Sequence, residues 1–335
     1  MNFFQSKLWK QINEKVYDKT TFQHKLFNQN YFGIIKEKNK FGLSLRWYQI
    51  LWVTIPESPE KVQNTIQTLK RDLDNSMWDI FLQLGITNLL HPNFDTFKYK
   101  NKEFCNKMKK KRKNKEQQLK TKYNLQKSFK ENMSLATIKI DLTQNKTDIM
   151  DSYKSSTRTS IRKWSKEWLI FQKAKNKQRD DFYDLWSKIA DAKWFSIPTQ
   201  KQYFNLKNYL IKENKWQLYL TTKNNQIVAW WVFLYPESDE AVYLYGATDR
   251  SFGNIWASYM LQHKTYLDLK DKGYKKCDLF GASPTWYKNH SLRWVTKFKR
   301  SFGGQKSEYF WNFDLIFKPK LYKTYRTRKK TKSWL

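Results

Sequence analysis

Apolar residues recur every three or four positions in the segment that follows Ser58 and Pro59. A serine cap followed by proline in the first turn is typical of a helix start. The spacing therefore predicts an amphipathic helix with one buried face. That face comprises Val62, Ile66, Leu69, Leu73 and Met77. Apolar segments over 49–55 and 79–86 predict a strand on each side, the second one ended by His91-Pro92-Asn93. Strand, helix, strand is half of an α/β domain.

The second half of the chain shows a longer alternation of segments with helical periodicity and segments with strand character. Gly273 is a typical helix C-cap, and Lys223–Gln226 is typical of a tight turn. The predicted elements are helices over 181–192 and 199–213, strands over 216–221, 227–235 and 241–245, a helix over 254–272 and a strand over 274–280. This order is expected of an acetyltransferase-like (GNAT) domain, which supports a fold more than a chemistry.

The segment between the two halves is polar and basic. Residues 101–132 have a run of five cations at 109–113, which suits either a solvated helix or loop, or a patch for RNA phosphates or an anionic membrane. Leu135–Leu142 alternates as a strand does and is predicted to close the first α/β unit.

Length and composition fit a globular protein of two domains. Of its 335 residues 40% are hydrophobic, which is enough for packed cores. The chain has 64 Lys and Arg against 30 Asp and Glu, a formal net charge of +34. Such a surface attracts nucleic acid, phosphorylated substrates or anionic membrane. A lysine-rich proteome from an AT-biased genome would give the same excess, so the charge alone does not decide the function.

Cysteine and histidine usage excludes several classes of site. Cys105 and Cys277 are the only cysteines, so a disulfide scaffold is excluded. The four histidines have no paired ligand spacing, and no metal site is expected. Because the chain has neither a signal-peptide pattern nor a long apolar run, we expect a cytoplasmic protein, with peripheral contact at the inner face of the plasma membrane as an option.

A series of short motifs in the second half resembles one known family. The motifs are Tyr243-Leu244-Tyr245-Gly246-Ala247, Ala257–Gln262, Gly273-Tyr274, Cys277–Gly281, Phe298-Lys299-Arg300-Ser301-Phe302-Gly303-Gly304, Glu308-Tyr309-Phe310, Asp314-Leu315 and Leu321-Tyr322. In this order and spacing they resemble the Fem-type (FemABX) aminoacyltransferases that build peptidoglycan cross-bridges. Arg158, Ile161 and Arg162 similarly resemble the basic helix that opens the second domain of this family. The resemblance is specific over 135–325 and weak before.

The resemblance implies an α/β (α+β) fold of two tandem acetyltransferase-like domains. The first would span 1–145, with 318–335 as a candidate for completing it, and the second would span 146–317. The last helix of the family often returns to the first domain, and the chain from Tyr322 onwards is placed to do so.

The reaction that the resemblance implies moves an amino acid from aminoacyl-tRNA to the stem peptide of a lipid-linked or UDP-linked peptidoglycan precursor, without a cofactor. Acyl transfer from an ester to an amine develops an oxyanion, which needs a fixed donor beside it. Lys299 stands where the family has such a lysine. Phe298 would stack near the terminal adenosine, with Lys297 and Arg300 near its phosphates. An ordinary basic strand end is the structural alternative.

Residues for the acceptor follow the family pattern less closely. Tyr203 matches a tyrosine that the family uses near the diphosphate of the acceptor. The arginine expected four residues earlier is Thr199 here, with Lys201 or Lys193 as substitutes. Tyr243 and Tyr245 are candidates for the acceptor channel, although strand tyrosines are commonly core residues. Asp278 either orients an amine or makes a structural hydrogen bond.

Two other functions remain open at this stage. The first is an N-acyltransferase of the same fold that uses acyl-CoA or acts on another surface polymer. Its pyrophosphate loop would precede the helix at Arg250–Ala257, where a second glycine is absent. The second is a non-enzymatic RNA-binding protein whose function is its charge.

Tryptophan is abundant and glycine scarce, at 16 and 9 residues. Average glycine usage of about 7% would give roughly 23 in this length. Several tryptophans occupy places where the family has glycine, namely Trp168, Trp294, Trp311, one of Trp230 and Trp231, and Trp256 as a further candidate. One hypothesis is that the source organism reads UGA codons as glycine and that they were translated here as tryptophan. A tryptophan-rich protein is the alternative.

Overall fold

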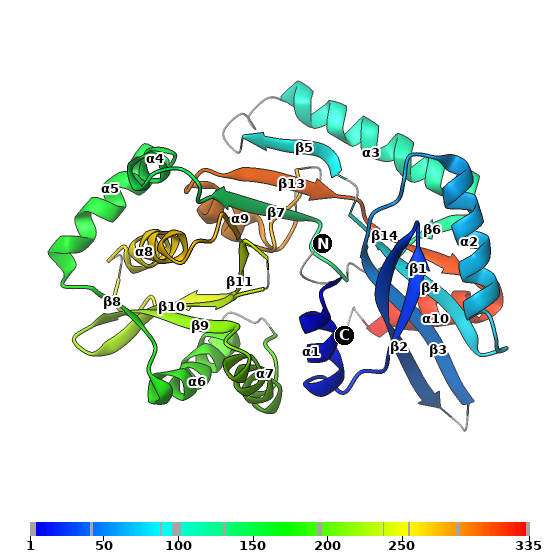
Figure 1. The fold of residues 1–335 in the computed structure, drawn as a ribbon, viewed down its shortest axis with the longest axis horizontal. Helices are drawn as coiled ribbons and strands as arrows, with labels where there is room; N and C mark the ends of the chain where they lie inside the picture. Colours follow the sequence, from blue (N-terminus) through cyan, green and yellow to red (C-terminus); the bar gives the residue numbers. More distant parts are fainter. Residues whose placement is uncertain are drawn as a thin grey trace.

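Two mixed β-sheets flanked by helices make up the computed structural model, which describes residues 5–40, 43–87, 89–95, 102–129, 132–192, 196–236, 238–253, 255–285 and 289–332. The two sheets lie side by side, and helix α1 (Lys7–Lys15) lies between them (Figure 1). Leu8 and Ile12 of α1 pack into the core of the larger sheet, while the chain continues into the smaller one.

The smaller sheet has six strands in the order β1-β2-β3-β4-β14-β6. These are β1 (Thr21–Leu26), β2 (Gln29–Lys40), β3 (Leu43–Val53), β4 (Asp79–Ile86), β14 (Asn312–Ile316) and β6 (Leu125–Lys127). Only β3 and β4 are parallel, and helix α2 (Pro59–Leu73) connects them. The Ser58 hydroxyl accepts a hydrogen bond from the Lys61 N–H, as its cap position predicts. Met77 lies beyond the helix and is 68% exposed, so its assignment to the buried face was wrong.

The larger sheet has eight strands in the order β5-β13-β7-β12-β11-β10-β9-β8. These are β5 (Leu89–Asp95), β13 (Gln305–Tyr309), β7 (Ala136–Asp141), β12 (Lys276–Asp278), β11 (Glu240–Thr248), β10 (Gln226–Leu234), β9 (Trp216–Lys223) and β8 (Ile170–Lys173). Strands β9, β10 and β11 form the predicted antiparallel meander. Helix α8 (Ala257–Asp271) then connects β11 to the parallel strand β12.

Helices cover both faces of the larger sheet. Side chains of α6 (Asn176–Ala192) and α7 (Gln200–Lys212) form a core with one face, while α4 (Lys146–Asp151), α5 (Ser155–Lys163) and α8 form a core with the other. A short 3-10 helix η3 (Trp164–Glu167) follows α5. Helix α7 begins with a complete capping box between Thr199 and Gln202.

Two segments lie in a different place from the one predicted. The strand at 135–142 does not close the first α/β unit, because β7 pairs with β12 and β13 in the larger sheet. His91-Pro92-Asn93 does not end a strand but lies within β5. A proline is tolerated there because β5 is an edge strand, where one missing N–H interrupts no inner ladder.

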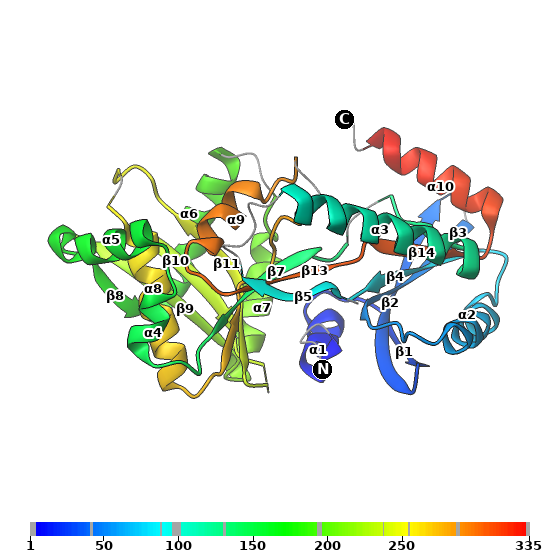
Figure 2. The same cartoon turned by 90° about the horizontal axis from the view of Figure 1, so that it is seen from above.

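The C-terminal segment connects the two sheets. The chain passes from β13 in the larger sheet directly into β14 in the smaller one, as Figure 2 shows. Helix α10 (Pro319–Lys332) then packs on the smaller sheet, where Tyr322 forms a buried cluster with Ile80 and Phe81 of β4. The polar segment before β6 forms helix α3 (Lys102–Tyr123). The predicted α/β class, with mixed sheets flanked by helices, is confirmed.

Candidate functional site

Strands β11 and β12 part soon after they meet. They pair over three residues only, from Glu240 opposite Lys276 to Val242 opposite Asp278. Beyond that point β11 continues to Thr248. The segment that follows β12 turns away from β11 in a loop that includes Phe280 and Gly281, whose φ angles are 38° and 62°. This left-handed backbone points successive carbonyl groups toward one side.

Lys299 lies under that loop. It belongs to α9 (Arg293–Arg300), its side chain is buried, and its Nζ donates to the carbonyl oxygens of Leu279 at 2.7 Å and Gly281 at 2.8 Å. It also donates to the carbonyl of Phe280. An ammonium has three N–H groups, so all of them are directed at the loop in this state. The lysine predicted from the sequence is therefore a buried cation, held in place by the carbonyl groups of the loop 279–281.

Burial is the main influence on the protonation of Lys299. Desolvation lowers the pKa of its amine to about 7, opposed by the nearby Asp278 and Cys277, which favour the charged form. The Nζ also lies 5.0 Å from the centre of the Tyr243 ring, a cation–π arrangement. An amine with a pKa near neutrality can hold a charge or transfer a proton under physiological conditions.

Phe298, the residue beside this lysine, packs among other rings. Its ring is stacked on Trp231, with the centroids 5.8 Å apart and an interplanar angle of 25°. It also meets Tyr259 and Phe302 edge-on, each at 5.2 Å. The indole N–H of Trp231 is buried without a hydrogen-bond partner. The face of Phe298 that a base would stack on is therefore covered by an indole in this chain.

The two flanking cations differ in exposure. Lys297 is exposed, with its Nζ 5.5 Å from the Trp294 ring centre, whereas Arg300 is half-buried. Both stand on the last turn of α9, on either side of Lys299. Lys297 is free to meet a polyanion from solvent.

Tyr243 and Tyr245 point to opposite faces of the sheet. Val232 pairs with Tyr245 and Phe233 with Tyr243, so Leu244 is an extra residue in β11 that forms a bulge. Tyr243 consequently packs with the core under α8, beside Lys299, while the Tyr245 ring lies 4.7 Å from Trp186 on α6. A regular strand would have placed both on one face. The two residues do not line one common channel.

The candidate acceptor residues on α7 are dispersed. Tyr203 is 2% exposed, and its hydroxyl donates to the Arg179 carbonyl inside an aromatic cluster. Lys201 is exposed on the same helix. Lys193 lies outside the described residues. The surroundings of Tyr203 are those of a core residue.

A charged cluster that sequence reasoning missed lies behind the loop. Lys139 of β7 bonds both carboxylate oxygens of Glu240 at 2.8 Å and lies 3.6 Å from the Asp278 carboxylate. Asp278 also accepts from the Phe280 N–H at 2.8 Å and from the Thr137 hydroxyl. The carboxylate therefore fixes the start of the loop whose carbonyls hold Lys299. Only the pairing of β7 with β12, which the sequence did not predict, brings Lys139 there.

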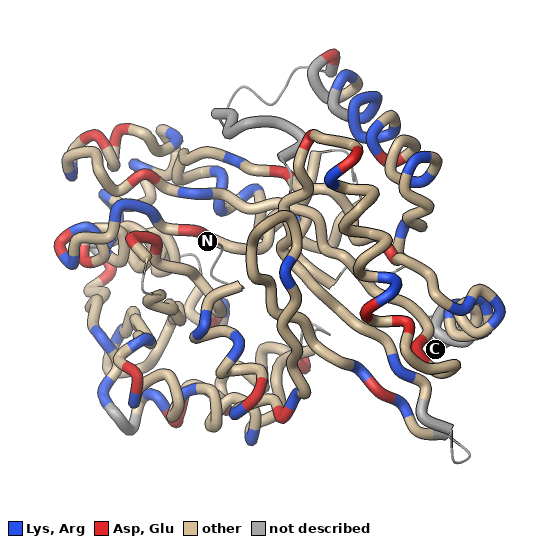
Figure 3. Tube along the Cα trace, turned by 45° about the vertical axis from the view of Figure 1, so that its right-hand side comes forward, with Lys and Arg blue, Asp and Glu red and all other residues tan. Residues whose placement is uncertain are grey.

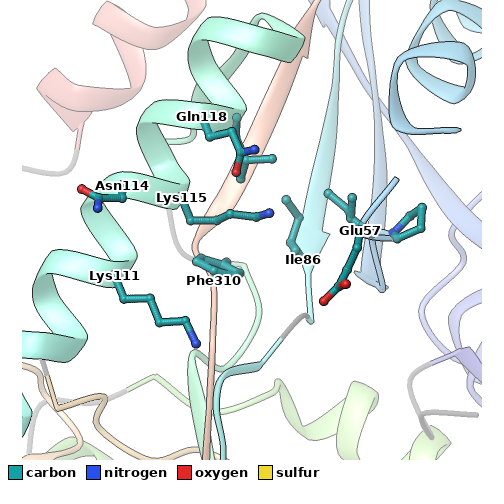
Figure 4. Close-up of a pocket in the computed structure, with 10 residues that line it drawn as sticks. Glu57, Ile86, Lys111, Asn114, Lys115, Gln118 and Phe310 are labelled. Carbon is teal, nitrogen blue, oxygen red and sulfur yellow. The ribbon is translucent and has the colours of Figure 1, made fainter. Parts of the chain in front are cut away.

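A separate cavity of about 440 Å³ lies beside the carboxyl ends of the parallel strands β3 and β4 (Figure 4). Lys111 and Lys115 of α3 and Glu57 supply its charges. Its apolar lining includes Ile55, Ile86, Leu119 and Phe310. Ligands of open α/β sheets commonly bind outside the carboxyl ends of parallel strands. Cations recur along α3 (Figure 3), which gives this side of the molecule a positive surface.

Among the residues that the structure describes, no three His, Cys, Asp or Glu side chains gather as a metal site. None of the described helices combines the length and the apolar character needed to cross a membrane.

The chain is similar to known proteins in part of its sequence and in its fold. Residues 211–330 match the model of the FemAB family. The crystal structure of FemX superposes with a TM-score of 0.69 at 14% identity, covering 97% of this chain and 94% of that one. A conserved protein of unknown function from Bacteroides thetaiotaomicron VPI-5482 superposes with a TM-score of 0.51 at 11% identity, covering 90% and 87%. No curated protein matches. The predicted resemblance to the Fem-type proteins is confirmed, by sequence over 211–330 and by fold over nearly the whole chain.

Proposed function

We propose that this protein is an aminoacyltransferase that moves an amino acid from aminoacyl-tRNA to the stem peptide of a lipid-linked or UDP-linked peptidoglycan precursor, at the inner face of the plasma membrane. The observation that supports it most is the buried ammonium of Lys299 beneath the loop 279–281, inside the segment that matches the FemAB family. The oxyanion that forms in acyl transfer is stabilised by a fixed hydrogen-bond donor, and a buried ammonium can serve as one without metal or thiol chemistry.

In the proposed reaction the acceptor amine attacks the carbonyl carbon of the aminoacyl ester. A C–N bond forms, the ester C–O bond breaks, and the 3′-terminal ribose oxygen of the tRNA leaves with a proton. The tetrahedral intermediate has a negative oxygen, to which one N–H of Lys299 would turn from a loop carbonyl. Catalytic hydrogen bonds often form only once substrate is bound, so the arrangement of the free protein is compatible with this exchange.

Lys297 and Arg300 are the proposed contacts for the phosphates of the tRNA end, because they flank Lys299 on the same turn. The terminal adenosine is proposed to stack on Phe298. That step requires the Trp231 indole to be absent or displaced, since it covers the ring. Glycine at position 231, one of the alternatives raised by the sequence, would leave the face open.

The phosphorylated part of the acceptor is proposed to bind in the cavity beside α3. Lys111 and Lys115 offer two cations to a diphosphate, while the apolar lining suits the uncharged part of the molecule. Tyr243 is proposed to stay beside the reaction centre. Tyr203 and Tyr245 keep structural roles, and Lys201 remains a candidate for contact at the outer rim.

The decisive experiment incubates the protein with labelled aminoacyl-tRNA pools and a muropeptide precursor. We expect label in the muropeptide, lost in a Lys299→Ala variant and kept in a Lys212→Ala variant, which removes one positive charge from an exposed position at the end of α7. Acetyl-CoA, supplied in parallel, is expected to be left unconsumed. Label that appears equally with both variants would reject the proposed role of Lys299.

A second candidate is an N-acyltransferase that uses acyl-CoA, and one observation favours it. Trp256, directly before α8, has φ 55°, and Gly253 in the same loop has φ 74°. If glycine occupies 256 in the cell, the loop has two left-handed glycines before a helix, as a pyrophosphate site requires. Consumption of acetyl-CoA with no transfer from tRNA would favour this candidate.

A further inference from the structure

Three tryptophans adopt a backbone conformation that tryptophan avoids. Trp52, Trp168 and Trp256 have φ angles of 66°, 53° and 55°. A positive φ brings Cβ against the neighbouring carbonyl, a clash that only glycine escapes and that asparagine and aspartate tolerate best. Most of the other non-glycine residues at positive φ follow that rule, being Asp18, Asn28, Asn124, Asn214, Asn224 and Asn225, with Phe27 and Phe280 as exceptions.

The surroundings of Trp52 explain why the backbone turns there. Ile50 pairs with Leu84 and Val53 with Ile86, so three steps along β3 match two steps along β4. One residue is therefore extra, and Trp52 is the left-handed residue of the resulting bulge. In the bulge type that has a left-handed residue, that residue is characteristically glycine. The sequence pattern had not singled out this tryptophan.

Trp168 follows the 3-10 helix η3 as its C-cap, with φ 53° and ψ 36°. That is the left-handed position at which helices commonly end with glycine. Its side chain is 83% exposed, so the strained backbone is not offset by burial of the indole. Trp256 is the N-cap of α8 at φ 55° and ψ 15°, and its side chain makes no cap hydrogen bond. A helix N-cap is normally extended, with a short polar side chain.

We infer that positions 52, 168 and 256 are glycine in the protein as its own cell makes it, through UGA codons that the organism reads as glycine. The scarcity of glycine and excess of tryptophan agree with this inference. The backbone gives no such support at Trp230, Trp231, Trp294 or Trp311, none of which has a positive φ. At Trp311 the indole also donates a 2.9 Å hydrogen bond to the Ser128 carbonyl and stacks under Lys127.

Glycine at position 52 changes the junction between the two sheets. The Trp52 ring lies 5.9 Å from the ring of Tyr309 and 6.3 Å from that of Phe280. Without the indole, an aromatic-lined space opens beside the residue whose carbonyl accepts from Lys299. This consequence rests on the proposed function: the space would hold an apolar part of the acceptor's stem peptide.

The identity of the three residues is tested on the gene and on the native protein. We expect UGA at codons 52, 168 and 256, and UGG at the codon of the buried core residue Trp186. Peptide mass spectrometry of the protein from its source should find glycine at all three positions. A UGG codon or a tryptophan mass at any of the three positions would overturn the inference for that position, whatever the protein's activity.

The backbone argument is tested separately with two exposed tryptophans in recombinant protein. Trp168→Gly removes the steric strain of a side chain at positive φ, so the midpoint of thermal unfolding should rise by about 1–2 °C. Trp294→Gly is the matched control, because residue 294 is 73% exposed and lies within α9. Glycine in a helix is unfavourable, and the midpoint should fall. An equal fall in both variants would overturn the argument from strain.

The opened space is tested with Trp52→Gly in the transfer assay. We expect a lower KM for the muropeptide with little change in kcat, relative to the chain with tryptophan. An unchanged KM in a folded, active variant would reject the space as an acceptor site and leave the glycine assignment intact. If neither protein transfers label, the proposed function fails, while the codons and masses still decide the residue identity.

Discussion

The molecule contains the same crossover unit twice, and only one copy opens around a buried cation. In each copy three antiparallel strands are followed by a helix and a fourth, parallel strand: β1-β2-β3, α2 and β4 in one, β9-β10-β11, α8 and β12 in the other. Strands β3 and β4 remain paired from Arg46 to Val53. Strands β11 and β12 part after Val242, and the loop over Lys299 occupies the opening.

A buried titratable group lies beside each copy, and the two have different kinds of surroundings. Asp314 in the smaller sheet accepts from the Tyr322 hydroxyl at 2.6 Å and from the Gln83 amide at 3.3 Å, all on regular elements. Lys299 in the larger sheet is held by carbonyls of an irregular loop. A substrate oxygen can replace a loop carbonyl as the hydrogen-bond acceptor of Lys299, because loops move more easily than packed strands. The partners of Asp314 lie on packed elements and are held in place. We therefore expect a role in the chemistry for Lys299 and a structural role for Asp314.

The largest expected effect is on turnover. Lys299→Ala should lower kcat by about 10²–10³, the loss typical of removing an oxyanion donor. Binding of aminoacyl-tRNA should change little, because the exposed Lys297 remains. Lys297→Ala serves as the control and should weaken tRNA binding, most at low salt, with kcat maintained. Equal losses of kcat in both variants would show that Lys299 has no role beyond that of another cation on α9.

The next effect is a pH dependence of opposite sign in the two copies. Burial lowers the pKa of Lys299 to about 7, so between about pH 7 and 10 the unfolded chain binds more protons and the free energy of unfolding rises with pH. Burial raises the pKa of Asp314 to about 6, against the Tyr322 and Gln83 hydrogen bonds that lower it. The folded state then binds more protons between about pH 4 and 6, and the free energy of unfolding falls as pH rises across that window.

Urea unfolding from pH 4 to 10 measures both slopes. Lys299→Met should flatten only the upper window, and Asp314→Asn only the lower one. Transfer activity that needs the charged amine should decline above about pH 7. If the free energy of unfolding of the Asp314→Asn variant still falls with pH in the lower window, another group titrates there.

The smallest expected effect is on stability alone. Tyr322→Phe removes the hydroxyl that donates to Asp314 and should lower the free energy of unfolding by about 1–2 kcal/mol, with kcat unchanged. Repeating the change in an Asp314→Asn background gives a double-mutant cycle that isolates the bond. A drop in kcat comparable to that of Lys299→Ala would place Asp314 in the chemistry after all.

Local signals predicted much of the second crossover unit. The meander, the helix that ends at Gly273 and the Phe298-Lys299 motif were all visible, because each depends on periodicity or a short motif. Helix α8 nevertheless starts at Ala257, and not at residue 254 as predicted. Gly253 and Trp256, which precede it, both have a positive φ.

Long-range pairing was not predictable in the same way. Whether β7 joins one sheet or the other depends on partners more than 130 residues away, such as Cys277 opposite Ile140. The bulge at Leu244, which separates Tyr243 from Tyr245, depends on the register with β10. A one-residue change of register reverses the face of every later side chain, and periodicity alone does not reveal it.

The passage from β13 to β14 has a consequence for biosynthesis. Both strands are internal: β13 lies between β5 and β7, and β14 between β4 and β6. A ribosome that has completed residues 1–300 has therefore released two sheets that each lack an inner strand. Neither can close until the segment 305–316 emerges. The nascent chain must keep four strand edges from aggregating during that delay, which makes it an expected client of chaperones that bind nascent chains.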